Sequence, residues 1–140
     1  LLAGWHVLDA FAGSGALGFE AASRGAAEVL MLERDAVLLR SLAEAKARLH
    51  ADAVQVIGGD ALAWLSRCAP GRFELVLLDP PFDSELFDTA LAAAAPAVAA
   101  GGSIYLEAPR VFATAPVGFT AYRHLRAGAV HAHLFRRLEG

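Results

Sequence analysis

Short, almost uninterrupted apolar runs alternate along this chain with longer segments whose apolar residues recur at helical spacing. An uninterrupted apolar strand is buried on both faces, whereas a strand with one face in water alternates polar and apolar residues. The alternation therefore predicts a parallel sheet with helices on both sides, an α/β fold. The expected strands are 5–10, 28–33, 53–57, 74–79 and 103–107, and the expected helices are 16–24, 36–50, 61–68 and 84–95, the last N-capped by Asp83 or Ser84.

The last part of the chain breaks this alternation. Residues 118–125 and 129–138 both have the composition of strands, and Arg126-Ala127-Gly128 lies between them. Two strands separated by a short glycine-containing segment are typical of a hairpin. We therefore expect an antiparallel strand to close the sheet.

The length and composition indicate one domain with a full core, since 56% of the 140 residues are apolar. No apolar run is long enough to cross a membrane, and the chain begins at Leu1 without a signal-peptide pattern. We expect a cytoplasmic domain. Cys68 is the single cysteine, which excludes an internal disulfide framework, and no cluster of side chains has the spacing of metal ligands. We expect Cys68 to be a buried spectator and the protein to need no metal.

Charge is distributed unevenly, although the net charge is only −3. Residues 1–109 hold seven Lys or Arg against fourteen Asp or Glu, whereas residues 110–140 hold five arginines against Glu139 alone. Three of the five histidines also lie in this second segment. Such a basic segment is either a solvated surface or a contact for a polyanion such as RNA. Arg136 and Arg137 are its candidate RNA contacts.

A glycine-rich loop follows the first expected strand. Residues 13–18, Gly-Ser-Gly-Ala-Leu-Gly, fit the pattern G-x-G-x-x-G. Glycine allows a tight turn and a close approach of the backbone to a ligand, and the next helix presents free N–H groups there. The pattern by itself suits nicotinamide dinucleotides as well as other nucleosides.

Acidic residues at the ends of the first three strands indicate which nucleoside is bound. Glu33 lies 20 residues after Gly13, where a carboxylate can accept hydrogen bonds from both ribose hydroxyls. Asp9 lies four residues before Gly13, where it would repel a pyrophosphate. It favours a ligand with a positive end, such as S-adenosylmethionine (SAM), whose sulfonium and ammonium accompany no phosphate. We expect Asp60 to accept a hydrogen bond from the adenine amine, to N-cap the next helix, or both.

The segment LVLLDPPFD, residues 75–83, is the strongest local signal. The fourth strand ends at Asp79, and Pro80-Pro81 stop it and supply no N–H groups. Carbonyl groups in this turn are then free to accept hydrogen bonds from another molecule. Phe82 follows at the sheet edge where such folds bind ligands, and an aromatic ring there can stack on a flat base.

Asp-Pro-Pro-Phe resembles the (D/N)-P-P-(Y/F) motif of methyltransferases that use SAM to modify exocyclic or amide nitrogens. The longer match, VLDAFAGSGALGFEAASRGAAEVLMLERD followed by LVLLDPPF, resembles the bacterial 16S rRNA guanine-N2 methyltransferases, the RsmD family. The resemblance covers residues 7–82 and continues more loosely through residues 101–107 and the tail. It implies the Rossmann-like class I SAM-dependent methyltransferase fold. This fold has a seven-stranded, mostly parallel sheet, an antiparallel C-terminal hairpin strand and helices on both faces.

The resemblance also implies roles for individual residues. Asp79 and the carbonyl of Pro80 would accept the two N–H bonds of a guanine N2, which makes this poor nucleophile more tetrahedral and stabilises its developing charge. Phe82 would fix the plane of the base, and positioning would supply the larger part of catalysis. We assign the SAM site to Asp9, Phe11, Ala12, Gly13, Ser14, Gly15, Glu33, Arg34, Asp60, Ala61 and Asp79, catalysis to Asp79, Pro80 and Phe82, and substrate binding to Pro81, Phe82, Arg136 and Arg137.

The expected substrate is 16S rRNA or a partly assembled small ribosomal subunit, and the expected state is a monomer away from membranes. The family carries a basic segment and a helix before the first strand, whereas Leu1 here directly precedes that strand. We therefore expect this chain to be the catalytic domain without that segment, and we expect the absence of the segment to lower RNA affinity.

Three other functions share part of this sequence pattern. An NAD-dependent oxidoreductase shares the glycine pattern, but Asp9 and the Asp-Pro-Pro-Phe motif argue against it. A SAM-dependent enzyme could instead modify adenine N6, cytosine N4 or a protein glutamine amide, for which Asn is commoner than Asp at position 79. A module with the same fold could also bind rRNA without turnover.

Overall fold

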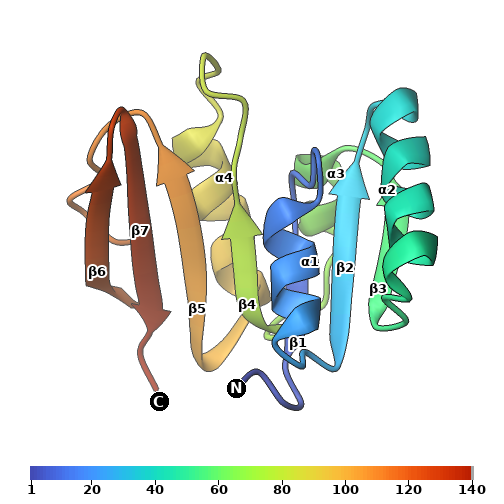
Figure 1. The fold of residues 1–140 in the computed structure, drawn as a ribbon. Coiled ribbons are helices and arrows are strands. Elements are labelled where there is room, and N and C mark those ends of the chain that lie inside the picture. Colours follow the sequence, from blue (N-terminus) through green and yellow to red (C-terminus); the bar gives the residue numbers. More distant parts are fainter. Residues whose placement is uncertain (140) are drawn as a thin grey trace.

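Seven strands form one mixed sheet in the computed structural model, which describes residues 1–139 (Figure 1). The strand order is β3-β2-β1-β4-β5-β7-β6. The first five strands run parallel, β7 runs antiparallel to β5, and β6 runs antiparallel to β7. The strands are β1 (His6–Asp9), β2 (Glu28–Glu33), β3 (Val54–Gly58), β4 (Phe73–Leu78), β5 (Val98–Ala108), β6 (Phe119–Ala127) and β7 (Val130–Arg137).

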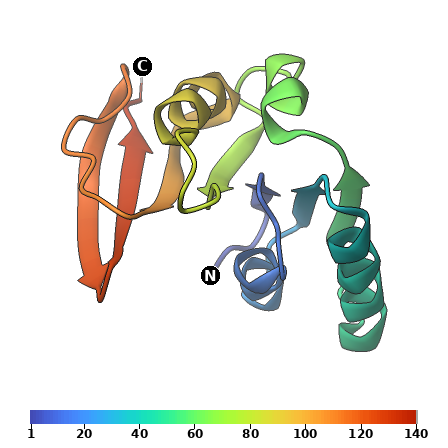
Figure 2. The same ribbon diagram turned by 90° about the horizontal axis from the view of Figure 1, so that it is seen from above.

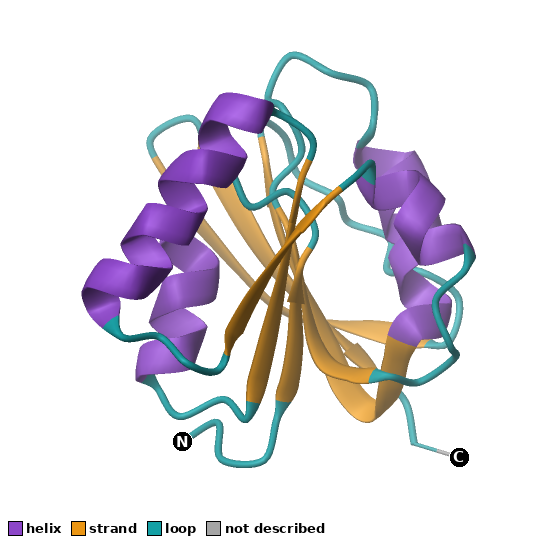
Figure 3. Cartoon of the chain, turned by 90° about the vertical axis from the view of Figure 1, so that its right-hand side faces the viewer, coloured by secondary structure: helices purple, strands orange, loops and turns teal. Residues whose placement is uncertain are grey.

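Helices cover both faces of the sheet, as the apolar strands predict (Figure 3). Helices α1 and α2 lie on one face and α3 and α4 on the other, which Figure 2 shows from above. The sequence-based prediction of the fold is therefore confirmed, including the antiparallel C-terminal hairpin. The helices are α1 (Ala16–Ser23), α2 (Ala36–Leu49), α3 (Ala61–Ser66) and α4 (Phe87–Ala94), and a short 3₁₀ helix η1 (Ala95–Ala97) follows α4.

Each face of the sheet has its own hydrophobic core. Successive side chains of a strand point to opposite faces, so Val7 of β1 belongs to the core under α1 and α2 and Leu8 to the core under α3 and α4. Both side chains are fully buried. This double burial is the reason that the parallel strands read as continuous apolar runs.

The strand order places a crevice at the carboxyl ends of β1 and β4. The chain leaves β1 towards β2 and β3 on one side, and β4 lies on the other side of β1. Loops that leave neighbouring strands in opposite directions open a ligand-binding crevice at this edge in α/β folds. The glycine loop after β1 and the Pro-Pro turn after β4 therefore lie side by side.

Three local predictions differ from the structure. Helix α4 begins at Phe87 rather than at residue 84, and its N-cap, Leu86, makes no side-chain hydrogen bond. The Ser84 hydroxyl donates instead to the Pro81 carbonyl at 2.6 Å. The Pro-Pro turn thus extends through Ser84, and neither Asp83 nor Ser84 caps the helix.

Strand β5 begins at Val98, earlier than predicted, and includes Gly101 and Gly102. A Cβ on Gly102 would lie 2.8 Å from the Glu74 carbonyl oxygen, so glycine is required beside β4. The pairing of β4 with β5 shifts register at this point. The two glycines are therefore part of an irregular strand and not a loop before it.

The hairpin turn consists of Gly128 and Ala129 rather than residues 126–128, because β6 continues to Ala127. Gly128 has a φ of 60°, and a glycine at the first central position matches a two-residue type II′ turn.

No helix within residues 1–139 is long and apolar enough to cross a membrane.

Candidate active site

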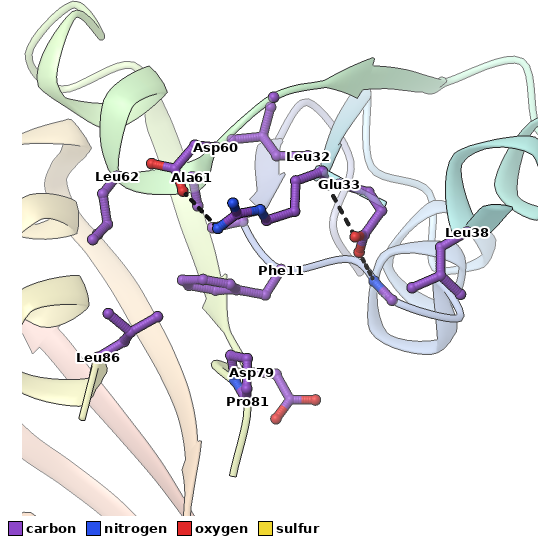
Figure 4. A pocket seen from close by; sticks show the side chains of 14 residues that line it. Phe11, Leu32, Glu33, Leu38, Asp60, Ala61, Leu62, Asp79, Pro81 and Leu86 are labelled. Carbon is purple, nitrogen blue, oxygen red and sulfur yellow. Dashed lines mark hydrogen bonds and ion pairs between the residues drawn. The ribbon is translucent and has the colours of Figure 1, made fainter. Parts of the chain in front are cut away.

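A cleft of about 290 Å³ lies at the carboxyl edge of the sheet, where the loops after β1, β2, β3 and β4 meet (Figure 4). Four separate loops thus contribute to one site. Its lining consists of Ala10, Phe11, Gly13, Leu32, Glu33, Arg34, Leu38, Gly59, Asp60, Ala61, Leu62, Asp79, Pro81 and Leu86.

The glycines of the loop after β1 have different tasks. Gly13 has a φ of 55° and lines the cleft, and a Cβ there would meet no heavy atom within 4 Å. Gly15 has a φ of 86° and precedes α1, and a Cβ there would lie 2.6 Å from Phe19 and 2.7 Å from Leu42. Gly13 therefore leaves open space for a ligand, whereas Gly15 allows α1 to pack closely.

Glu33 ends β2 and organises the backbone around it. One carboxylate oxygen accepts the Gly13 N–H at 2.9 Å, and the other accepts the N–H groups of Arg34 at 3.0 Å and Asp35 at 2.9 Å. An ionised carboxylate offers about four acceptor positions. Glu33 lines the cleft, so it retains capacity for one further donor from a ligand.

Asp9 lies beneath the glycine loop rather than in the cleft lining. Its side chain is 1% exposed, and one oxygen accepts the Gly18 N–H at 3.1 Å. The other oxygen is buried and has no hydrogen-bond partner within residues 1–139. Burial, with a smaller contribution from the negative charges of Asp79 and Glu33, raises the pKa of Asp9 to about 7 against the lowering effect of the Gly18 hydrogen bond.

Asp60 is the N-cap of α3, as the sequence predicts. One carboxylate oxygen accepts the Ala63 N–H at 2.9 Å, and the other lies 3.6 Å from a guanidinium nitrogen of Arg34. Both side chains are largely exposed at the cleft. The contact of Asp60 with adenine stays a prediction.

Apolar side chains form the walls between these carboxylates. In the view of Figure 4, the Phe11 ring lies between Asp60 and Asp79 and is directed towards Leu62 and Leu86. Apolar walls with a few polar groups are typical of small-molecule sites. The flat part of a nucleoside fits such walls.

Asp79 directly follows β4, is exposed, and lines the cleft, whereas Pro80 is buried. Phe82 is 43% exposed and lies outside the lining. The Pro81 carbonyl accepts hydrogen bonds from both the N–H and the hydroxyl of Ser84. The Pro81 carbonyl is thus engaged within the turn, which leaves the Pro80 carbonyl as the one that we assign to a substrate.

Two residues of β5 flank Asp79, and the sequence analysis did not identify them. The Tyr105 hydroxyl donates to Glu107 at 3.3 Å. Partial burial raises the pKa of Asp79, and the charge of Glu107 raises it further. Partial burial also raises the pKa of Tyr105 to about 12, together with the charge of Glu107. Their contact with the site depends on the pairing of Leu77 with Tyr105, which only the sheet topology reveals.

The cleft gathers about half of the predicted site residues. Ala12 is buried and its N–H donates to the Leu32 carbonyl at 3.0 Å, and Ser14 is exposed. The predicted residues in the cleft lining are Phe11, Gly13, Glu33, Arg34, Asp60, Ala61, Asp79 and Pro81, and those outside it are Asp9, Ala12, Ser14, Gly15, Pro80, Phe82, Arg136 and Arg137. The lining residues that the sequence analysis missed are Ala10, Leu32, Leu38, Gly59, Leu62 and Leu86.

Arg136 and Arg137 lie at the end of the sheet remote from the cleft. Arg136 pairs with Ser103 in β5, whereas the cleft end of β5 is Ala108. Arg136 also lies 4.2 Å over the Tyr122 ring, and Arg137 donates to the Ala95 carbonyl at 2.9 Å. Their RNA contact stays a prediction.

The electrostatics of the cleft favour a cationic ligand. The lining acids are Glu33, Asp60 and Asp79, the buried Asp9 lies beneath the glycine loop, and the lining cation Arg34 is paired with Asp60. Carboxylates at this density repel a phosphate, and a nearby positive charge stabilises their ionised form. In the part of the chain that the structure describes, no group of three or more side chains is arranged to hold a metal.

The fold and this site define the class: the chain has the Rossmann-like fold of class I SAM-dependent methyltransferases, with an acid-lined cleft at its carboxyl edge. The chain belongs to the family described as Conserved hypothetical protein 95, whose model matches residues 2–136. Among solved structures, a candidate methyltransferase from Escherichia coli has a TM-score of 0.88 and 31% identity, with 100% of this chain and 79% of that chain covered. A candidate methylase from Haemophilus influenzae has a TM-score of 0.89 and 30% identity, with 99% and 89% covered.

Sequence relatives agree with this family. Ribosomal RNA small subunit methyltransferase D of Escherichia coli K12 is 32% identical over 134 residues, which are 93% of this chain and 67% of that protein. The protein of the same name from Haemophilus influenzae is 40% identical over 87 residues, which are 60% of this chain and 45% of that protein.

Proposed function

We propose that this protein is a SAM-dependent methyltransferase that methylates the exocyclic N2 of a guanine in 16S rRNA. The observation that carries the proposal is the position of Asp79 between two sites. It lines the acid-rich cleft and also begins the Asp-Pro-Pro-Phe turn at the same edge. One carboxylate can therefore contact both a cationic donor and a base presented from outside. The names of the relatives support rRNA as the substrate.

The residues of the cleft fit SAM. Glu33 would accept a hydrogen bond from the ribose, and Phe11 with the leucine walls would enclose the adenine ring. The buried, unpartnered oxygen of Asp9 places negative charge beneath the glycine loop, where a positive group is favoured. When bound, SAM supplies a methyl group on a positively charged sulfur.

The chain's own residues would act on the acceptor base. A guanine N2 has two hydrogens and a lone pair that is delocalised into the ring. Asp79 and the Pro80 carbonyl would accept hydrogen bonds from the two N–H groups, and the half-exposed Phe82 would stack on the base. A base held in this way must leave a stack or come from a single strand.

The acceptor can be identified directly. The protein is incubated with tritiated SAM and with separate pools of rRNA, tRNA, DNA and protein, and the labelled nucleosides are analysed by mass spectrometry. Label in 16S rRNA as N2-methylguanosine is the expected result. Label in N6-methyladenine, N4-methylcytosine or a glutamine amide would overturn the guanine assignment while keeping SAM as the donor.

The donor is tested separately by calorimetry with SAM, S-adenosylhomocysteine and NADH. We expect the two sulfur nucleosides to bind and NADH not to bind, because carboxylates surround the cleft. Binding of NADH alone would overturn the proposal.

A further inference from the structure

The positive charge of the C-terminal hairpin is not confined to Arg136 and Arg137. Strand β7 runs antiparallel to β5, and His131 near its start pairs with Ala108 at the carboxyl end of β5. The hairpin turn therefore lies at the same edge of the sheet as the loop after β4, as Figure 1 shows. His133 of β7 is level with Leu78 at the end of β4, two strands or about 10 Å away, and the turn lies four residues, about 13 Å, further along the strand.

Four basic side chains near this turn form what we name the hairpin ridge: Arg110, His124, Arg126 and His131. The pairing of Arg126 with His131, and of His124 with His133, puts these hairpin side chains on one face. The His124 and His131 rings are stacked, with centroids 5.1 Å apart and ring nitrogens at 2.9 Å.

Arg110 is joined to the hairpin through buried side chains. Its guanidinium carbon lies 3.9 Å from the centroid of the Phe112 ring. The Phe112 N–H donates to the Nε2 atom of His133 at 2.9 Å, and the His133 ring lies 4.9 Å from His124. The ridge is therefore continuous from the segment after β5 to the hairpin turn.

The ridge carries the positive charge of Arg110 and Arg126, which the hairpin itself does not neutralise. Desolvation and the charges of Arg126 and His124 lower the pKa of His131, so His131 supplies a ring plane rather than a charge. Residues 117–138 contain no Asp or Glu. Arg126 donates one hydrogen bond to the Gly128 carbonyl at 3.0 Å, which leaves its other donors free of that contact. Arg110 lies 3.4 Å from Asp88, and both side chains are more than half exposed, so this pair is weak.

Guanidinium groups on the same ridge as the stacked imidazole rings of His124 and His131 suit a nucleic-acid strand. Arginine binds phosphate oxygens with its planar set of donors, and unpaired bases stack on flat side chains. We propose that the hairpin ridge binds the RNA strand next to the target nucleotide while that nucleotide enters the Asp-Pro-Pro-Phe turn. This inference rests on the proposed function and adds to it the path of the substrate.

The ridge is tested by RNA binding with full-length protein and a fluorescent fragment of 16S rRNA. We expect the double variant Arg110→Gln/Arg126→Gln to bind RNA about tenfold more weakly, because each substitution removes one contact with a phosphate. The slope of log K against log salt should fall by about 1.4 for a single strand. Its affinity for SAM should stay unchanged, since neither arginine lines the cleft.

Two control variants accompany it. Arg40→Gln/Arg48→Gln removes the same charge from exposed positions on α2 and should bind RNA as the wild type does. Arg136→Gln/Arg137→Gln removes the same charge from the remote end of the hairpin, where the sequence predicts RNA contacts. A greater loss of RNA affinity in this variant than in Arg110→Gln/Arg126→Gln would overturn the ridge. Thermal unfolding of each variant verifies that it is folded.

The outcomes separate this inference from the proposed function. If the wild type methylates RNA and Arg110→Gln/Arg126→Gln binds RNA unchanged, the ridge is wrong and the function stands. If Arg110→Gln/Arg126→Gln and Arg40→Gln/Arg48→Gln lose the same RNA affinity, the ridge is also overturned, because an equal loss reports net charge alone. If the wild type neither binds nor methylates RNA, the proposed function fails first.

Discussion

Glu33 and Gly13 are 20 residues apart in sequence, and one oxygen of the Glu33 carboxylate accepts the Gly13 N–H at 2.9 Å. The acid at the end of β2 thus holds the glycine loop after β1 in place (Figure 4). Glu33 therefore both shapes the loop and lines the cleft.

Replacement of Glu33 by Gln should weaken SAM binding by about 1–3 kcal/mol, the scale of a hydrogen bond that involves a charge. Calorimetry measures this change. Glu44→Gln removes the same charge from an exposed position on α2 and is the control. Equal affinities for the wild type and Glu33→Gln would exclude Glu33 from the donor site.

Asp79→Asn should lower the rate of methyl transfer by about 100-fold or more, because it removes the charge that stabilises the developing positive charge on the base. Binding of SAM should also weaken, because Asp79 lines the cleft, but by a smaller factor than the rate. Asp83→Asn, an exposed position in the same turn, is the matched control and should keep full activity. An active Asp79→Asn enzyme would contradict the acceptor role of this residue.

The buried Asp9 predicts a specific pH dependence of stability. Burial raises its pKa from 3.8 to about 7. Between these pH values Asp9 is protonated in the folded state and ionised in the unfolded state. The free energy of unfolding of the wild type should therefore fall by a few kcal/mol between about pH 4 and about pH 7, relative to Asp9→Asn.

Urea denaturation of both proteins across this range measures the difference. Titrating groups that do not interact with Asp9 cancel in the comparison, which leaves Asp9 and the neighbouring acids Asp79 and Glu33. Parallel pH profiles for the wild type and Asp9→Asn would contradict the raised pKa of Asp9.

The glycines of the loop should respond differently to alanine. Gly15→Ala should lower the free energy of unfolding by about 2–4 kcal/mol, because it adds a clash with Phe19 and Leu42 to the strain of a positive φ. Gly13→Ala carries the strain alone and should cost about 1–2 kcal/mol. Its Cβ would occupy the cleft, so SAM affinity should fall. Denaturation and calorimetry on both variants check this, and equal destabilisation would refute it.

Local chemistry made much of this protein predictable. Continuous apolar runs require burial on both faces, so they identified the parallel strands and the two layers of helices. The acid of Asp60 just before an apolar helical segment indicated the N-cap that the structure contains. The glycine pattern and Asp-Pro-Pro-Phe both follow strand ends, which places them at one edge of a parallel sheet whatever the strand order.

Other features depended on which strands are neighbours. Asp9 follows Val7 on the same face of β1, so α1 covers it and the side chain lies beneath the glycine loop. Tyr105 and Glu107 reach Asp79 only because β5 pairs with β4.

The tail shows the same limit. Sequence located its basic residues, but antiparallel pairing decided that Arg126 lies at the cleft edge and Arg136 at the opposite end. Sequence thus determined the elements and their chemistry, because propensity and burial act locally. Tertiary structure determined which side chains meet, because strand pairing joins residues that are distant in sequence.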